Sequence, residues 1–186
     1  MVQLKRTWYL GETTMPAAAV RLDFFRDAGE VKRCHTERTL RSQTVAQHSW
    51  GVATILLMVH PEADAKLLRA ALWHDVSERA MGDIPSPVKW ASEGMHAAIE
   101  SLEDDINKQW DIMPKGLTEA ERALLKFCDA FEFYLWTREE MAMGNTFMYT
   151  PQQNITAFLN NFMLRYSTRA MVAYDACRQL WETYHE

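Results

Sequence analysis

Four ionisable residues of this chain stand among apolar neighbours at helical spacing: His48, His74, Asp75 and Asp129. Apolar residues follow His48 at offsets of four, seven and eleven, so its side chain should project from the inward face of a helix. Burying a carboxylate without a partner costs several kcal/mol, and this chain places two of them beside two histidines. A divalent cation would resolve that conflict, because two neutral imidazoles and two carboxylates balance its charge and leave positions for water and substrate oxygens.

Each of these residues also has a purely structural explanation. A His-Asp pair arises by chance in many chains of such a composition, and a lone histidine on an apolar stripe is most often a hydrogen-bonded core residue. Asp129 could be the partner of Arg122 or Lys126 in a buried ion pair. The metal interpretation is favoured because all four residues fall on three successive inward faces.

Two further acids follow His74 within a short stretch. Glu78 lies four residues after His74, on the same face of a continuing helix, where a carboxylate could hold an attacking water or transfer a proton. Its alternative is an exposed carboxylate that pairs with Arg79 or Lys89. Asp83 follows a glycine in a turn, so its alternative is a simple turn or cap residue.

The elements that must position these residues are helices. The helical patterns span residues 16–28, 44–59, 64–77, 91–110, 118–143, a segment that starts near 150, and 168–184. Thr118 and Glu121 have the spacing of a capping box, and almost no stretch alternates long enough to predict a strand. We therefore expect an all-α protein in which residues 1–186 form a single domain.

The composition argues against two classes of partner. The net charge of −5 and the scattered lysines and arginines are unlike a protein that grips long nucleic acid, although a small anionic substrate remains compatible. The longest apolar runs fall far short of the roughly 20 residues of a membrane span, and no signal peptide opens the chain, so we expect a cytoplasmic protein. Three cysteines without CxxC spacing favour reduced thiols over disulfides or a cysteine zinc site.

Three blocks of the sequence resemble a known family. His48, the His74-Asp75 pair and Asp129 follow the H…HD…D order of the HD-domain metal-dependent phosphohydrolases. The similar blocks are RSQTVAQHSWGVA, ALWHDVSERAMGDIPSPVKW and CDAFEFYLWTREEMAMGN. They look like the corresponding blocks of YfbR-type 5′-deoxynucleotidases and of phage DatZ-type dATP triphosphohydrolases, and the resemblance covers roughly residues 22–146.

This resemblance implies a helical HD core in which the two histidines and two aspartates hold one divalent ion, which could be zinc, cobalt, manganese or iron. It also implies that Glu78 and Asp83 lie beside the metal and position water and the leaving oxygen. The expected partner is a small deoxynucleotide, with no long nucleic acid and no membrane, and the expected assembly is a homo-oligomer, either a dimer or a hexamer. If the chain is encoded by a phage, its compartment is the host cytoplasm.

Five residues are candidates for substrate contacts: Arg33, Cys34, His35, Arg41 and Lys89. Arg33 stands where the YfbR group carries an arginine followed by a tryptophan that together shape the sugar pocket, but the next residue here is Cys34. Arg41 corresponds to a family arginine and suits bidentate phosphate binding, although a surface role is equally open. His35 either reaches the substrate or caps the loop, and Lys89 either approaches a phosphate or is solvated.

These observations predict a metal-dependent phosphohydrolase of 2′-deoxynucleoside 5′-phosphates. Because Cys34 and His35 depart from the YfbR pattern, the preference is narrowly for a dATP triphosphohydrolase that releases deoxyadenosine and triphosphate. The alternative is a 5′-deoxynucleotidase that releases phosphate from monophosphates. A second alternative is a catalytically idle HD module that only binds a nucleotide, against which the presence of Glu78 and Asp83 argues.

Overall fold

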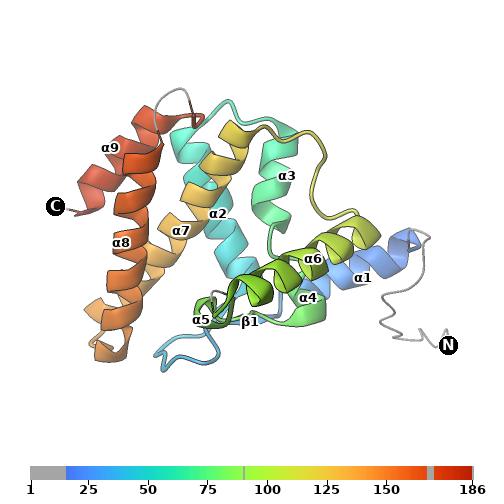
Figure 1. Cartoon of the computed structure of the whole chain (residues 1–186), viewed down its shortest axis with the longest axis horizontal. Helices are drawn as coiled ribbons and strands as arrows, with labels where there is room; N and C mark the ends of the chain where they lie inside the picture. Colours follow the sequence, from blue (N-terminus) through green and yellow to red (C-terminus); the bar gives the residue numbers. More distant parts are fainter. Residues whose placement is uncertain (1–15, 90, 167–169, 186) are drawn as a thin grey trace.

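The computed structural model describes residues 16–89, 91–166 and 170–185, and within these ranges its regular secondary structure is almost all helix (Figure 1). The predicted all-α class is therefore confirmed. In chain order the elements are α1 Ala18–Ala28, β1 Lys32–Arg33, β2 Gln43–Thr44, α2 Val45–Val59, α3 Ala65–Trp73, α4 Glu78–Met81, α5 Ser86–Lys89, α6 Glu93–Trp110, α7 Glu119–Ala142, the 3-10 turn η1 Thr146–Met148, α8 Tyr149–Arg165 and α9 Tyr174–His185. The two short strands pair antiparallel, Lys32 with Thr44 and Arg33 with Gln43.

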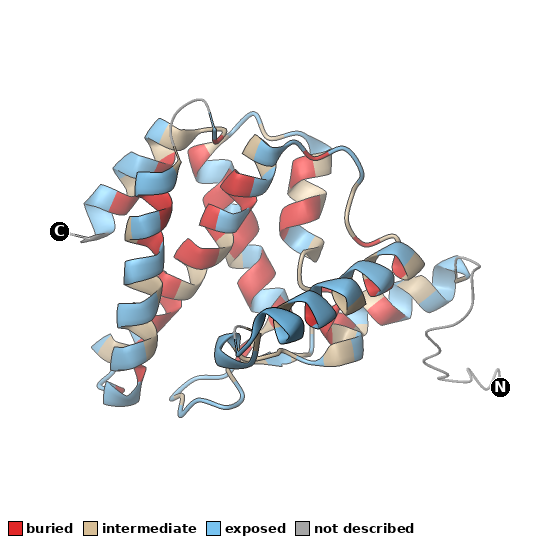
Figure 2. Ribbon diagram, in the orientation of Figure 1, coloured by how far each residue is buried: buried red, intermediate tan, exposed pale blue. Residues whose placement is uncertain are grey.

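Helices α2 and α7 pack against each other at the centre of the bundle, while α3 packs on α2 and α8 packs on α7 (Figure 1). Both central helices begin with a capping box, Thr44 with Gln47 and Thr118 with Glu121, and the second is the one that the sequence predicts. Both helices carry many buried positions, drawn red in Figure 2. The side chain of Phe127 on α7 is fully buried. This pair is the rigid frame that holds His48 and Asp129.

A second, smaller apolar cluster joins α1 to α6 and to the segment after α3. The ring of Phe24 stacks on Trp110 with 3.8 Å between centroids, and Val76 and Ile112 are buried in the same cluster. Val76 immediately follows Asp75 in the chain. Burial of Val76 therefore fixes the backbone that carries the His-Asp pair.

The third helix is shorter than the predicted range 64–77. α3 ends at Trp73, and the following residues form turns in which N–H groups bond to carbonyls three residues earlier, from Val76 to Trp73 and from Glu78 to Asp75. The short helix α4 then starts at Glu78 and ends at a glycine with φ of 78°. The apolar pattern continues through this tightened segment, so periodicity alone does not reveal the break.

The last helix also starts later than the predicted residue 168. α9 begins at Tyr174, directly after Ala173, whose φ of 55° is left-handed and ends helical geometry on its N-terminal side. Residues 168 and 169 of the predicted helix lie outside the described residues. Of the helices in the described ranges, none is both long and apolar enough to cross a membrane.

Candidate metal and active site

The four predicted metal ligands converge where the end of α3 meets α2 and α7. His48 lies on α2, Asp129 lies on α7, and His74 and Asp75 lie in the turn after α3. The Nε2 atom of His48 is 3.2 Å from Nε2 of His74, 3.2 Å from Oδ1 of Asp129 and 3.5 Å from Oδ2 of Asp75. Ligand atoms of His48, His74 and Asp129 all lie within 4.8 Å of one another. Segments far apart in the sequence thus bring three potential ligands together, and Asp75 Oδ2 lies 3.5 Å from Nε2 of His48 and 3.4 Å from Nε2 of His74.

The two imidazole rings turn nitrogen lone pairs toward each other. Nδ1 of His74 donates to the carbonyl oxygen of Ala71 at 2.9 Å, and Nδ1 of His48 donates to a carboxylate oxygen of Glu132. In the neutral tautomers that these bonds favour, both Nε2 atoms are acceptors, and they face each other beside two carboxylates. Such an arrangement favours a positive charge beside His48, which either a second proton on its Nε2 atom or a bound cation can supply. The donor set therefore fits a divalent cation.

The electrostatics of the ligands agree with this interpretation. Burial lowers the pKa of His48, but its hydrogen bonds to Asp129 and Glu132 outweigh burial and raise the pKa to about 9. Without a metal, His48 therefore holds a second proton on Nε2 near neutral pH, and a metal ligand at this position would have to give up that proton. Burial raises the pKa values of Asp75 and Asp129, but neighbouring positive groups outweigh it and hold both below the usual range. The principal opposing groups are His74 for Asp75 and Lys126 for Asp129. Both carboxylates are consequently ionised and available as ligands.

Glu132 belongs to the site, although the sequence prediction did not include it. Its carboxylate accepts the His48 Nδ1–H on one oxygen and the amide of Gln43, at 2.8 Å, on the other. Gly51 on α2 makes room for it, because a Cβ atom at that position would lie 2.6 Å from Cγ of Glu132. A carboxylate that receives the second ring nitrogen of a histidine is the usual support of a histidine metal ligand. Its position three residues after Asp129, on the same face of α7, is the available sequence signal.

Arg33 reaches the cluster from the end of β1. Its guanidinium forms an ion pair with Asp75, and its side chain is only 12% exposed. The Nε atom of Arg33 has no hydrogen-bond partner among the described residues. A buried guanidinium with an unused donor beside a candidate metal group is suited to contact an anionic substrate.

Asp83 holds the chain segment that follows Arg33. Its Oδ2 accepts the backbone N–H of Cys34 at 2.7 Å and lies 3.8 Å from Nδ1 of His35. Cys34 has a φ of 53°, and burial raises the pKa of its thiol to about 12, so the side chain is an uncharged thiol. The predicted residues Arg33, Cys34, His35 and Asp83 are thus brought together near Asp75. The hydrogen bond from the Cys34 N–H to Asp83 is typical of a residue that anchors a turn.

Glu78 is buried next to the same cluster. Its Oε2 atom has no hydrogen-bond partner among the described residues, and burial, followed by the charge of Asp75, raises the pKa of Glu78 to about 9. The structural alternative for Glu78 gains no support, because Arg79 pairs with Asp27 and Lys89 pairs with Glu103. A buried acid with a free oxygen is typical of a group that transfers protons.

Three basic residues lie at or beyond the edge of the site. Lys126 Nζ is 2.9 Å from Oδ2 of Asp129, so one of the ion pairs considered as the structural alternative does form, on the oxygen that does not face His48. Arg41 binds Glu139 and Glu140 at the far end of α7. Lys89 contacts Glu103 on α6. None of these contacts joins Arg41 or Lys89 to a proposed metal ligand, although the charge of Lys89 acts on nearby Glu78, and the predicted substrate roles of both residues stay predictions.

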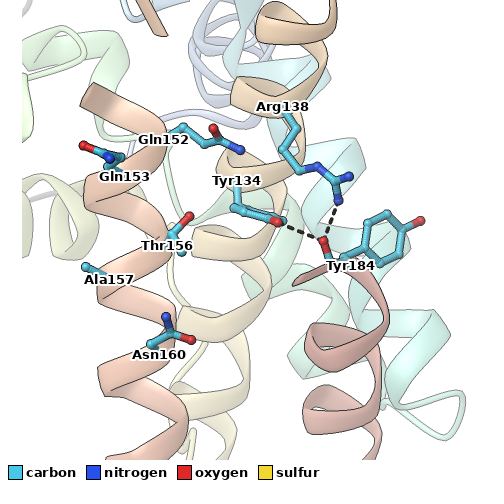
Figure 3. Close-up of a pocket in the computed structure, with 8 residues that line it drawn as sticks. All are labelled: Tyr134, Arg138, Gln152, Gln153, Thr156, Ala157, Asn160 and Tyr184. Carbon is cyan, nitrogen blue, oxygen red and sulfur yellow. Dashed lines mark hydrogen bonds between the residues drawn. The ribbon is translucent and has the colours of Figure 1, made fainter. Parts of the chain in front are cut away.

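A hollow of about 530 Å³ lies elsewhere on the molecule. It is open to solvent and is lined by residues of α7, α8 and α9, where Arg138 and Tyr134 both donate to the backbone carbonyl of Tyr184 (Figure 3). Its lining includes none of the predicted ligands or acids. Size alone therefore does not identify the functional site of this protein.

Comparison with known proteins agrees with the geometry. The model of the family described as "5′-deoxynucleotidase YfbR-like" matches residues 22–119, more than half of the chain. The chain belongs to the YfbR-like family. The recognised HD-domain family and the prediction of a hydrolase are therefore confirmed.

Relatives of this YfbR-like protein include a 5′-deoxynucleotidase from Erwinia tasmaniensis, 28% identical over 151 residues that cover 67% of this chain and 75% of that protein. A 5′-deoxynucleotidase from Cronobacter sakazakii is 30% identical over 143 residues, which cover 62% of this chain and 69% of that protein.

Two solved structures share the fold of the YfbR-like chain. One is an HD-domain phosphohydrolase from Listeria innocua, with a TM-score of 0.71, 19% identity and 90% of each chain covered. The other is the cyanophage S-2L HD phosphohydrolase DatZ bound to dA and one catalytic Zn²⁺ ion, with a TM-score of 0.65, 19% identity, and 92% of this chain and 97% of DatZ covered. At this level of identity, both comparisons concern the fold alone.

Proposed function

We propose that this protein is a metal-dependent 5′-deoxynucleotidase, which releases inorganic phosphate from 2′-deoxynucleoside 5′-monophosphates. The observation that carries the proposal is the group of two imidazoles and two carboxylates flanked by the buried acid Glu78 and the buried guanidinium of Arg33. Relatives named 5′-deoxynucleotidases, found along most of the chain, support the choice of substrate class.

The proposed metal ligands are His48, His74, Asp75 and Asp129, and Glu132 is proposed to orient His48. A bound divalent ion such as zinc, cobalt, manganese or iron supplies a Lewis acid that polarises a phosphoryl oxygen and makes water more acidic.

We assign proton transfer to Glu78. During hydrolysis a water oxygen bonds to phosphorus, the bond from phosphorus to the 5′ oxygen breaks, and that oxygen takes up a proton as the nucleoside leaves. Glu78 is placed to carry this proton, since its free Oε2 is buried beside Asp75. The unused Nε of Arg33 offsets charge on the phosphoryl oxygens, and Asp83 holds the following turn through Cys34.

The narrow sequence preference for a dATP triphosphohydrolase gains no support. It relied on Cys34 in place of the tryptophan of the YfbR pattern, yet the family model and the named relatives are of the monophosphatase type. The likeness to DatZ, at 19% identity, bears on the fold and not on the substrate. We therefore put the 5′-deoxynucleotidase first and infer that Cys34 and His35 replace the missing tryptophan at the edge of the sugar pocket.

A nucleotide panel tests the proposal. The purified protein is stripped with a chelator, reloaded separately with each candidate metal, and incubated with deoxyribonucleotides and ribonucleotides at each phosphorylation level. We expect metal-dependent release of phosphate from deoxyribonucleoside monophosphates, with ribonucleotides cleaved far more slowly. Equal rates of cleavage of deoxyribonucleotides and ribonucleotides would refute selection of the sugar. Nucleotide binding without turnover, whichever metal is loaded, would favour the catalytically idle binding module. The predicted homo-oligomer is to be checked in the same preparation by light scattering.

A further inference from the structure

A buried carboxylate lies at the end of α7, about three helical turns beyond the proposed metal ligand Asp129. Glu140 is completely buried and accepts four hydrogen bonds. One oxygen accepts the backbone N–H of Leu40 at 2.7 Å and the amide of Asn145 at 2.7 Å. The other accepts the backbone N–H of Arg41 at 3.0 Å and its Nε at 3.3 Å. Three of these four donors belong to the loop between β1 and β2.

That loop, residues 34–42, connects the site to the end of α7. At its start, Asp83 accepts the N–H of Cys34, and at its end Glu132 accepts the amide of Gln43. Between these anchors the loop is held by Glu140, and Asn145 adds a hydrogen bond of 2.8 Å to the carbonyl oxygen of Arg38. Two of these four anchoring residues, Asp83 and Glu132, therefore lie beside the proposed metal group, while Glu140 and Asn145 hold the middle of the loop.

The surroundings of Glu140 show that the charge itself is needed. Burial raises the pKa of Glu140, but hydrogen bonds from Leu40, Asn145 and Arg41 outweigh burial and hold the pKa below its usual value. An ionised carboxylate can satisfy two backbone N–H groups and two side-chain donors at once. An amide in the same place would turn its NH₂ group toward one of the backbone N–H donors in either orientation.

We propose that Glu140 is a positioning residue for substrate recognition: it clamps the loop 34–42 so that Arg33, Cys34 and His35 are held against the proposed deoxynucleotide site. The proposal rests on the proposed function, because it assigns the loop a role toward that substrate. The clamp acts through the backbone of the loop and touches no proposed ligand of the metal.

The first test follows the loop itself by amide hydrogen exchange in Glu140→Gln and in the matched control Glu139→Gln. Glu139 is the neighbouring residue, 60% exposed, and it binds only the outer side of Arg41 at 2.9 Å. We expect exchange of the Leu40 and Arg41 amides to rise by about tenfold or more in Glu140→Gln, with α2 and α7 unchanged. The control should behave like the wild type. Unchanged protection of both amides in Glu140→Gln would overturn the clamp.

The second test follows recognition with the metal-loaded enzyme. For Glu140→Gln we expect the KM for a deoxyribonucleoside monophosphate to rise by about tenfold, a smaller change in kcat, and a weaker preference over the ribonucleotide, because a displaced loop loosens the sugar pocket. Metal content should remain at the wild-type level. A KM and a sugar preference equal to those of Glu139→Gln, despite faster exchange of the loop, would refute the positioning role.

A second variant guards against loss of folding. Asn145→Ala removes one donor to Glu140 and the bond to Arg38 but leaves the carboxylate in place, so its effects should have the same direction and a smaller size. Opposite or absent effects in a folded Asn145→Ala protein count against the clamp. If the wild type and Glu139→Gln both fail to cleave any nucleotide, the proposed function itself is wrong.

Discussion

Replacing Glu132 by glutamine tests whether this carboxylate supports His48 as a metal ligand. The change keeps the size of the side chain, and the new amide oxygen can still accept the Nδ1–H of His48. The introduced NH₂ group would face Gln43, whose own Oε1 has no partner among the described residues and can accept the bond after a flip of that amide. We therefore expect a folded protein that has lost one negative charge beside the proposed metal.

The expected magnitude follows from the site. The Glu132 side chain is 13% exposed and that of His48 is fully buried, so water screens their interaction weakly. A charge-assisted hydrogen bond becomes a neutral one, and loss of such supporting partners typically costs 10–100-fold in metal affinity, or about 1.4–2.7 kcal/mol. We predict a fall of about 30-fold in zinc affinity.

The assay is a competition titration of zinc between the protein and a chromophoric chelator, with Glu139→Gln as the exposed control on the same helix. The control should bind zinc like the wild type. If Glu132→Gln retains full affinity while remaining folded, Glu132 does not tune the metal ligand, and its contact with His48 only serves packing.

The remaining predictions concern a ligand, the proton carrier and a helix cap. Asp129→Ala should abolish stoichiometric metal binding, measured by elemental analysis after purification, because Asp75 alone cannot balance the cation; full retention would remove Asp129 from the ligand set. Glu78→Gln should lower kcat by about 10² or more while metal content stays normal, and unchanged turnover would exclude it as proton carrier. Hydrogen bonds from Lys66, at 2.8 Å, and from the Thr118 N–H lower the pKa of Glu121 from 4.5 to about 2. These bonds therefore stabilise the folded protein fully above pH 4.5, and this contribution is lost as the pH falls toward 2. The difference in Tm between the wild type and Glu121→Gln should shrink over that interval, and a constant difference would contradict this linkage.

The ligand geometry could be predicted because helical periodicity relates residues that are far apart in the chain. His48 and Asp129 lie on the apolar faces of the two central helices, α2 and α7. The inward direction of both side chains therefore follows from the sequence alone. The capping box at Thr118 likewise is a local signal that needs no tertiary information.

Other features depend on contacts that no local pattern contains. The support of His48 by Glu132 requires the close approach of α2 to α7 at Gly51. The break after Trp73 comes from a change of hydrogen-bond spacing under an unbroken apolar pattern. The anchoring of Leu40 by Glu140 joins residues 100 positions apart, and only the folded chain brings them together.

The substrate could not be chosen from the loop alone. Cys34 in place of a tryptophan pointed toward the triphosphohydrolase, but a single substitution at the edge of a pocket does not fix which phosphorylation level fits. The proposed choice of a monophosphate rests instead on the family model and the named relatives.

The central claim is tested most directly by phosphorus NMR of the metal-loaded protein incubated with an equimolar mixture of dAMP and dATP. The account predicts that the dAMP resonance is replaced by that of inorganic phosphate while the three resonances of dATP persist. Appearance of inorganic triphosphate, with dAMP unchanged, would contradict it and restore the triphosphohydrolase.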